Sequence, residues 1–199
     1  SGVPAAIFKL RHPSVPSILT LQEGDPPEAI EKTMRPLWPL FKRAFTKADA
    51  VQAISTFLGD WANRMGFQGP LAIIPNGASV PVGVAYDQAE LDELSRSVGI
   101  KEGEFVMVSV SRLVHQKAID INLRALALLP ERVRYLIVGD GPDTDALKSL
   151  AAELGVTDRV VFVGRVDRSM TSKYRKIADV FVIPSRSEGL GISFLSTMA

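Results

Sequence analysis

The second half of the chain alternates short apolar runs with amphipathic segments, and this alternation restricts the fold more than any other feature. The runs predicted as buried strands are 105–110, 133–138, 159–163 and 179–183. The segments predicted as helices are 118–129, 143–154, 169–177 and the residues from Gly191 onward. Nearly continuous apolar strands that alternate with helices through short loops indicate a parallel sheet with helices on both faces.

The first half is less regular but shows the same kinds of element. Strands are predicted at 17–21, 50–54 and 71–74, and helices at 27–45 and 56–65. Pro36 and Pro39 should break the longer helix, because proline lacks a backbone N–H and clashes with the preceding turn.

The stretch around Pro81–Val84 fits neither period and is predicted to be a linker. We therefore expect domains at 1–82 and 83–199, each a Rossmann-like parallel-sheet domain of the α/β class. Each half is small for a complete domain of this type. Since the final helix has only begun at Ala199, we expect both domains to be incomplete and the chain to be a segment of a longer protein.

Composition narrows the function. A net charge of +1 over 199 residues gives no electrostatic case for binding nucleic acid. The chain has no cysteine, and its two histidines, His12 and His115, are far apart, so we expect no metal site. No apolar run reaches membrane-spanning length and no signal-peptide pattern is present, which predicts a cytoplasmic protein.

Two cations stand in the loop that follows the strand at 105–110. Arg112 offers a planar fork of donors and Lys117, five residues later, offers a point charge. Together they suit a diphosphate, although two solvated surface cations are the simpler interpretation of this loop alone.

Two further strands end in glycine. Gly139 and Gly141 resemble the start of a dinucleotide fingerprint, but Thr144 occupies the position of its third glycine. A tight turn that lines a crevice explains them equally well. Gly164, after the next strand, either lets a planar base approach the backbone or simply ends the strand.

The fourth strand leads into Pro184–Leu195, where Glu188 lies among small residues just before a predicted helix. The simpler interpretation is a surface glutamate in a serine-rich turn. However, parallel strands end at one edge of their sheet, where open α/β proteins bind ligands. Cations, exposed backbone and a carboxylate at that edge suit a nucleoside diphosphate that carries a hydroxyl-rich group.

These blocks resemble a known family in their order and spacing. The sequences "VSRLVHQKAID", "LIVGDGP", "LGVTDRVVFVGRV" and "ADVFVIPSRSEGLGISFLSTMA" are similar to the nucleotide-sugar half of family 4 retaining glycosyltransferases, which have the GT-B fold. "PSILTLQEGDP", "ADAVQAIST" and "IIPNG" resemble the N-terminal domain of the same family. The resemblance covers nearly the whole chain.

The resemblance implies transfer of a hexose from a UDP- or GDP-linked sugar to an acceptor hydroxyl, with retention of configuration and without a cofactor or metal. The acceptor remains open among a glycan, a lipid-linked sugar and a small molecule. Two alternatives also remain: a nucleotide-sugar-binding module that performs no chemistry, and a GT-B sugar-nucleotide epimerase.

The resemblance also assigns site residues. Those implied to be catalytic are Arg112, Lys117 and Glu188. Those implied to bind the donor are Gly139, Gly141, Gly164, Arg165, Val166, Gly189, Leu190, Gly191 and Ser196. Those implied to face the acceptor are Gln22, Glu23 and Gly24.

Three positions depart from the family pattern. Ser196 stands where a second glutamate usually contacts the ribose, so a charged acceptor of hydrogen bonds is lost there. Gln22 stands where many members have a histidine, and it cannot act as an acid or base. Ala118 replaces the glycine usual after Lys117, which we expect to be a minor change.

A basic and aromatic segment in the first half allows two interpretations. Its residues are Arg35, Trp38, Phe41, Lys42, Arg43, Phe45 and Lys47. Such a segment can lie on an anionic membrane surface, which would place the protein peripherally at a membrane and suit a lipid-linked acceptor. We favour the other interpretation, a helix whose apolar face packs on the sheet of its own domain.

Overall fold

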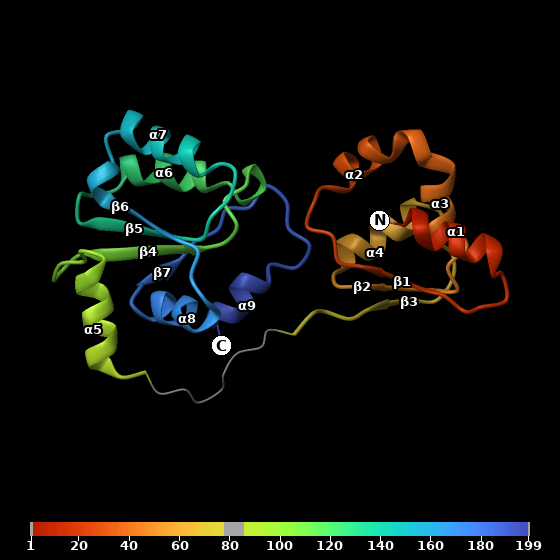
Figure 1. The fold of residues 1–199 in the computed structure, drawn as a ribbon, viewed down its shortest axis with the longest axis horizontal. Helices are drawn as coiled ribbons and strands as arrows, with labels where there is room; N and C mark the ends of the chain where they lie inside the picture. The colour runs from red at the N-terminus through yellow and green to blue at the C-terminus, as the bar shows by residue number, and fades with distance from the viewer. Residues whose placement is uncertain (1, 78–85, 199) are drawn as a thin grey trace. The chain divides into compact units, whose positions relative to one another are not determined.

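The computed structural model describes residues 2–77 and 86–198, and it divides into two compact units (Figure 1). The first unit holds residues 2–77 together with Ser187–Ile192, and the second holds residues 86–186 and 193–198. The linker predicted at Pro81–Val84, and with it the boundary between 82 and 83, lies outside the described residues.

The first unit contains a three-stranded parallel sheet in the order β1-β2-β3. Its strands are β1 (Ile18–Leu21), β2 (Ala50–Ala53) and β3 (Leu71–Ile73). Its helices are α1 (Val3–Arg11), α2 (Pro27–Met34), the 3-10 turn η1 (Arg35–Leu37), α3 (Trp38–Thr46) and α4 (Thr56–Arg64). The three strands and the break at Pro36 are confirmed, whereas α1 was not predicted.

The core of this unit is built around aromatic side chains from α3 and α4. Phe41, Phe45 and Trp61 are buried, and the rings of Phe45 and Trp61 meet edge to face with centroids 5.2 Å apart. The indole N–H of Trp61 donates to Glu31 across 2.8 Å, so its polar atom is satisfied. The packing interpretation of the basic and aromatic segment is therefore confirmed for Phe41 and Phe45, and Trp38 packs against the same core.

The second unit contains a four-stranded parallel sheet in the order β6-β5-β4-β7. Its strands are β4 (Phe105–Val110), β5 (Val133–Val138), β6 (Val160–Gly164) and β7 (Val180–Phe181). Its helices are α5 (Gln88–Ser97), η2 (His115–Lys117), α6 (Ile119–Leu128), α7 (Thr144–Glu153), η3 (Thr157–Arg159) and α8 (Arg168–Lys176). The last helix, α9 (Ile192–Met198), begins where the two units meet in the sequence.

Helices cover both faces of the second sheet, as the apolar strands predicted. In Figure 1, α6 and α7 lie on one side of the strands, and α5 and α8 lie on the other. Separate apolar clusters fill the two layers: Leu123 and Leu147 belong to the first, and Leu94 and Tyr174 belong to the second. Helix α5 was not predicted, although Asp87 caps its N-terminus by accepting from the Ala89 N–H at 3.0 Å.

Strand β7 is shorter than predicted, and just beyond its end side chains bind the carbonyl oxygen of Val182. The Ser109 hydroxyl donates to the carbonyl oxygen of Val182, and the Asn122 side-chain amide reaches the same oxygen at 3.4 Å. The Tyr135 hydroxyl closes the network, 2.6 Å from the Ser109 hydroxyl and 2.8 Å from the Asn122 amide nitrogen. Burial raises the pKa of Tyr135 to about 12, so this hydroxyl stays neutral.

Candidate functional site

A cavity of about 470 Å³ opens where strands β4, β5 and β6 end. The residues that line it are Val110, Ser111, Arg112, Val138, Gly139, Asp140, Gly141, Arg165, Val166 and Thr171. Five of these were predicted from the sequence to be site residues: Arg112, Gly139, Gly141, Arg165 and Val166. The edge of the sheet therefore brings these parts of the chain together, as the parallel topology requires.

The two glycines after β5 allow one loop to pack directly against the loop after β4. Gly139 has a φ of +137°, and a Cβ added there would lie 2.9 Å from the carbonyl carbon of Ser111 and closer still to its oxygen. A Cβ added to Gly141 would lie 2.7 Å from the carbonyl carbon of Leu113. Backbone hydrogen bonds join the same loops, including Leu113 N–H to the Asp140 oxygen at 3.0 Å. Both glycines thus shape the cavity wall.

The turn that begins α7 is closed by side chains in place of a third glycine. The Thr144 hydroxyl donates to the Asp140 carboxylate at 2.9 Å, and the Gly141 N–H donates to the same oxygen at 2.8 Å. These bonds, led by that from Thr144, hold the pKa of Asp140 below its ordinary value. Asp140 therefore keeps a negative charge in the cavity wall.

Ser111 is a site residue that sequence reasoning missed. Its hydroxyl oxygen is buried, yet it has no hydrogen-bond partner among the described residues. Buried hydroxyls nearly always have a partner, so an unpaired one in a cavity wall is a candidate ligand contact. The sequence contains only a serine beside Arg112, and nothing in it signals that the hydroxyl is buried and unpaired.

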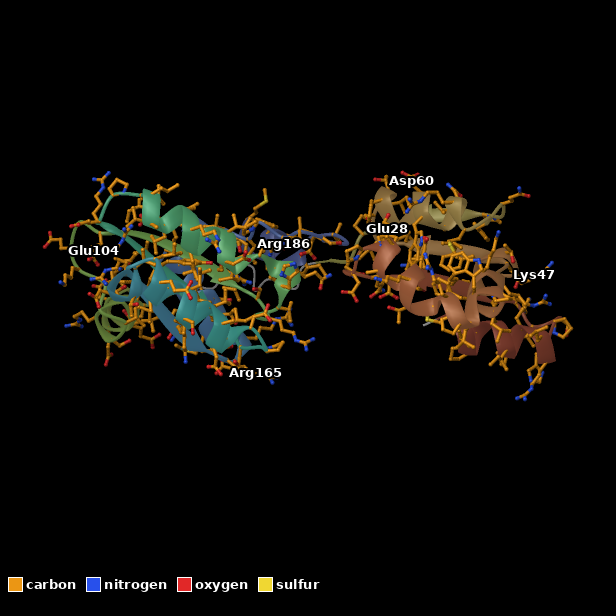
Figure 2. All side chains as sticks on the ribbon, turned by 90° about the horizontal axis from the view of Figure 1, so that it is seen from above. Glu28, Lys47, Asp60, Glu104, Arg165 and Arg186 are labelled. Carbon is orange, nitrogen blue, oxygen red and sulfur yellow. The ribbon has the colours of Figure 1, made fainter. Side chains whose placement is uncertain are left out.

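Arg112 and Arg165 give the cavity its positive charge. Both side chains are exposed and both residues line it, one after β4 and the other after β6. Figure 2 shows Arg165 well separated from Arg186, which lies in a different part of the second unit. Two guanidinium groups on a concave surface suit an anionic ligand with several oxygens.

Lys117 is not among the residues that line this cavity. It ends the short turn η2, and its backbone N–H donates to the Val114 oxygen at 2.9 Å. The next residue, Ala118, is buried and adopts a left-handed conformation with φ 54° and ψ 35°. A Cβ in this region costs about 1–2 kcal/mol, so alanine in place of glycine strains this turn. The expectation that the replacement is a minor change stays a prediction.

The segment that carries Glu188 belongs to the first unit. A Cβ added to Gly189 would lie 3.3 Å from the carbonyl carbon of Glu23, and the Ser187 hydroxyl donates to the Gly24 oxygen at 3.1 Å. Leu190 packs against the apolar core of the same unit. The turn predicted to face the acceptor, Gln22 to Gly24, thus contacts the segment predicted to hold the donor sugar.

The remaining predicted residues lie around this segment. Gly191 is buried with a φ of +72°, and Ser196 is half-buried on α9. Gln22 is exposed, whereas Glu23 and Glu188 are half-buried. The predicted cooperation of Glu188 with Arg112 and Lys117 involves residues of two separate units, and it stays a prediction.

Comparison with known proteins places the chain in a family. Residues 91–199 match the family described as glycosyl transferases group 1. The chain belongs to this family. The predicted resemblance to GT-B glycosyltransferases is confirmed. The matching residues include all those that line the cavity.

Two relatives illustrate the likeness. Alpha-monoglucosyldiacylglycerol synthase of Streptococcus pneumoniae is 38% identical over 115 residues, which cover 56% of this chain and 26% of that protein. A GDP-mannose-dependent alpha-(1-6)-phosphatidylinositol monomannoside mannosyltransferase of Mycobacterium tuberculosis is 32% identical over 171 residues, which cover 80% of this chain and 44% of that protein. The chain thus spans less than half the length of either relative.

Solved structures confirm the fold class. The structure of Anabaena HepE in complex with UDP and glucose matches 99% of this chain and 54% of its own, with a TM-score of 0.81 and 23% sequence identity. The glycosyltransferase WaaG, involved in lipopolysaccharide biosynthesis, matches 98% of this chain and 60% of its own, with a TM-score of 0.71 and 17% identity. Every helix within residues 2–77 and 86–198 is too short or too polar to span a lipid bilayer.

Proposed function

We propose that the protein is a retaining glycosyltransferase that moves a hexose from a nucleoside-diphosphate sugar to an acceptor hydroxyl. The observation that carries this proposal is the cavity at the ends of β4, β5 and β6, where Arg112 and Arg165 stand beside the unpaired hydroxyl of Ser111. The size and charge of this cavity suit the phosphates and ribose of a nucleotide. The family match supports the proposal that the nucleotide is part of a sugar donor.

Arg112 and Lys117 bind the diphosphate in this proposal. As the bond between the anomeric carbon and the phosphate oxygen breaks, negative charge develops on the departing diphosphate and the two cations stabilise it. They thereby do the work that a metal ion does in other transferases, so the proposed reaction uses no metal and no cofactor. The Ser111 hydroxyl adds a neutral hydrogen bond to the same group.

The other assigned residues hold the rest of the donor and the acceptor. Glu188 accepts hydrogen bonds from hydroxyls of the sugar, and the backbone of Gly189 to Gly191 lies alongside it. The backbone from Gly164 to Val166 lies against the base, and the Ser196 hydroxyl replaces a carboxylate at the ribose. The turn from Gln22 to Gly24 faces the acceptor, whose hydroxyl oxygen forms the new bond to the anomeric carbon while its proton passes to the departing diphosphate.

The relatives suggest the donor and acceptor classes. HepE was crystallised with UDP and glucose, and the mycobacterial relative is named as GDP-mannose-dependent. Both curated relatives are named for glycolipid products or acceptors. We therefore propose a UDP- or GDP-hexose as donor and a glycolipid or other glycan as acceptor, reached by a cytoplasmic protein at a membrane surface.

Calorimetric titration with UDP, GDP and ADP tests the nucleotide site. We expect UDP or GDP to bind, and we expect Arg112→Ala to weaken that binding about ten- to a hundredfold, the range for a hydrogen bond to a charged group. Arg124→Ala is the matched control, because Arg124 is an exposed arginine on α6 that does not line the cavity. Equal binding by both variants would place the nucleotide elsewhere.

A non-catalytic sugar-nucleotide module is the second candidate, favoured by Gln22 and Ser196. The intact protein that contains this chain distinguishes the two. With radiolabelled donor and a lipid extract as acceptor, transfer by the unmodified protein supports the enzyme. If Ser196→Glu tightens donor binding while neither form transfers sugar, the module is the correct reading.

A further inference from the structure

Arg186 binds three parts of the loop that carries Lys117. Its two terminal nitrogens, Nη1 and Nη2, donate to the two carboxylate oxygens of Asp120 at 2.8 and 2.6 Å. Nη1 also donates to the His115 carbonyl oxygen at 2.7 Å, and the backbone N–H of Arg186 donates to the Gln116 oxygen at 2.8 Å. We call these four bonds the Arg186 clamp. A two-pronged pair between guanidinium and carboxylate fixes direction as well as distance.

The clamp spans a turn whose backbone is strained. His115 lies before Lys117 and Asp120 lies after it, so the bonds reach both sides of the left-handed residue Ala118. An alanine in that conformation is strained, and it persists only where its surroundings enforce it. Asp120 stands in the first turn of α6 and Arg186 follows β7, so the clamp fastens this turn to a neighbouring strand end.

We propose that Arg186 is a positioning residue that holds Lys117 in place for the donor diphosphate, an inference that rests on the proposed function. Lys117 has a long flexible side chain, so its usefulness depends on where its backbone is fixed. Without the clamp, η2 and Ala118 would sample other conformations. Ligand binding would then have to order this turn, and the lost conformational entropy would lower the affinity for the diphosphate. Arg186 itself need not touch the donor.

The ionisation of the pair agrees with this role. The hydrogen bonds from Arg186 lower the pKa of Asp120, and the same bonds raise the pKa of Arg186. Both groups therefore stay charged throughout the physiological range. Each side chain is about one-third exposed, at 32% for Arg186 and 31% for Asp120, so the bidentate geometry matters more than the charge alone.

Comparing a diphosphate with its nucleoside tests the inference. We expect Arg186→Ala to weaken binding of UDP or GDP by about three- to tenfold, with little change for uridine or guanosine, which lack the diphosphate. Arg186→Lys keeps the charge but loses the fork, and Asp120→Asn keeps the shape but loses the charge; both should give smaller losses. Glu90→Gln is the control, because it breaks the 2.6 Å ion pair with Lys173 elsewhere in the same unit.

Coupling to Lys117 decides between positioning and general stability. In a Lys117→Ala background, Arg186→Ala should cause almost no further loss of diphosphate affinity, because the group it positions is gone. Hydrogen exchange of the Lys117 and Ala118 amides should also quicken in Arg186→Ala, whether or not ligand is present. This readout remains available in Arg186→Lys if the alanine variant does not fold.

The outcomes distinguish the positioning role of Arg186 from nucleotide binding itself. Equal losses for nucleotide and nucleoside, additive effects of Arg186→Ala and Lys117→Ala, or unchanged exchange at Ala118 would each overturn the positioning role while leaving nucleotide binding intact. If the unmodified protein binds neither UDP nor GDP, the proposed function fails, and the role of Arg186 in donor binding fails with it.

Discussion

Replacing Gly139 by alanine should damage the second unit far more than the same change at Gly164. Both glycines have positive φ, +137° and +80°, so each alanine strains the backbone, by about 1–3 kcal/mol. Only at Gly139 does the new Cβ also meet backbone, that of Ser111, whereas nothing lies within 4 Å at Gly164. Forcing the two loops apart adds about 1–3 kcal/mol of overpacking. We therefore expect Gly139→Ala to be the more destabilising by that amount.

The positions of the tryptophans allow the unfolding of the first unit to be followed separately. Trp38 and Trp61, the only tryptophans of the chain, both lie in the first unit. During urea unfolding, tryptophan fluorescence therefore follows the first unit, while far-ultraviolet circular dichroism follows both. Gly139→Ala should lower the midpoint of the dichroism transition, leave the fluorescence midpoint in place and weaken nucleotide binding. Equal midpoints for Gly139→Ala and Gly164→Ala would refute the close packing of the two loops.

Three further changes probe the second unit. Asn122→Leu should lower its stability by about 1–3 kcal/mol in urea unfolding, because the buried Tyr135 hydroxyl loses the amide donor at 2.8 Å and the Val182 oxygen loses one of its two side-chain donors; unchanged stability would show that the network is dispensable. Arg186 lowers the pKa of Asp120, so this pair stabilises the fold above pH 3.8, the ordinary pKa of the carboxyl, and its contribution disappears as pH falls through the lowered value. Acid titration of Asp120→Asn should therefore show a smaller loss of stability below that pH than the unmodified protein. Ala118→Gly relieves about 1–2 kcal/mol of strain but loses a buried methyl worth about 0.8 kcal/mol, so its stability should change little while Arg186→Ala becomes less harmful to nucleotide binding in that background.

Strands and helices could be predicted where the buried positions follow the apolar pattern expected for that element. The strands at 105–110 and 133–138 were predicted to the residue, because buried parallel strands are continuously apolar. Helix α5 was overlooked although its signals are present: Asp87 as the cap, with Leu91 and Leu94 three residues apart. It is mostly polar, and its one apolar stripe is weak, so the sequence gives little signal for a helix between the predicted linker and the strand at 105–110.

The candidate site was predictable only as a set of loops. Sheet topology places the strand ends at one edge, so Arg112, Gly139 and Arg165 could be grouped from the sequence. Contacts between distant residues could not be foreseen in this way. The unpaired Ser111 hydroxyl, the packing of Gly189 on Glu23 and the clamp between Arg186 and Asp120 all depend on where backbone passes in three dimensions.

The glycines show how such contacts change the meaning of a motif. Gly139 and Gly141 resemble a phosphate-binding fingerprint, yet the space that their missing Cβ atoms leave is filled by the loop from Ser111 to Leu113. Their spacing is therefore explained by loop packing, which sets the shape of the cavity. Gly164 is different, because its Cβ position faces open space next to Arg165 and Val166, which line the cavity. Among the three strand-end glycines, Gly164 is therefore the one at which the packing of the protein leaves the proposed approach of a planar base unobstructed, whereas the backbone of Ser111 and Leu113 already fills the corresponding space at Gly139 and Gly141.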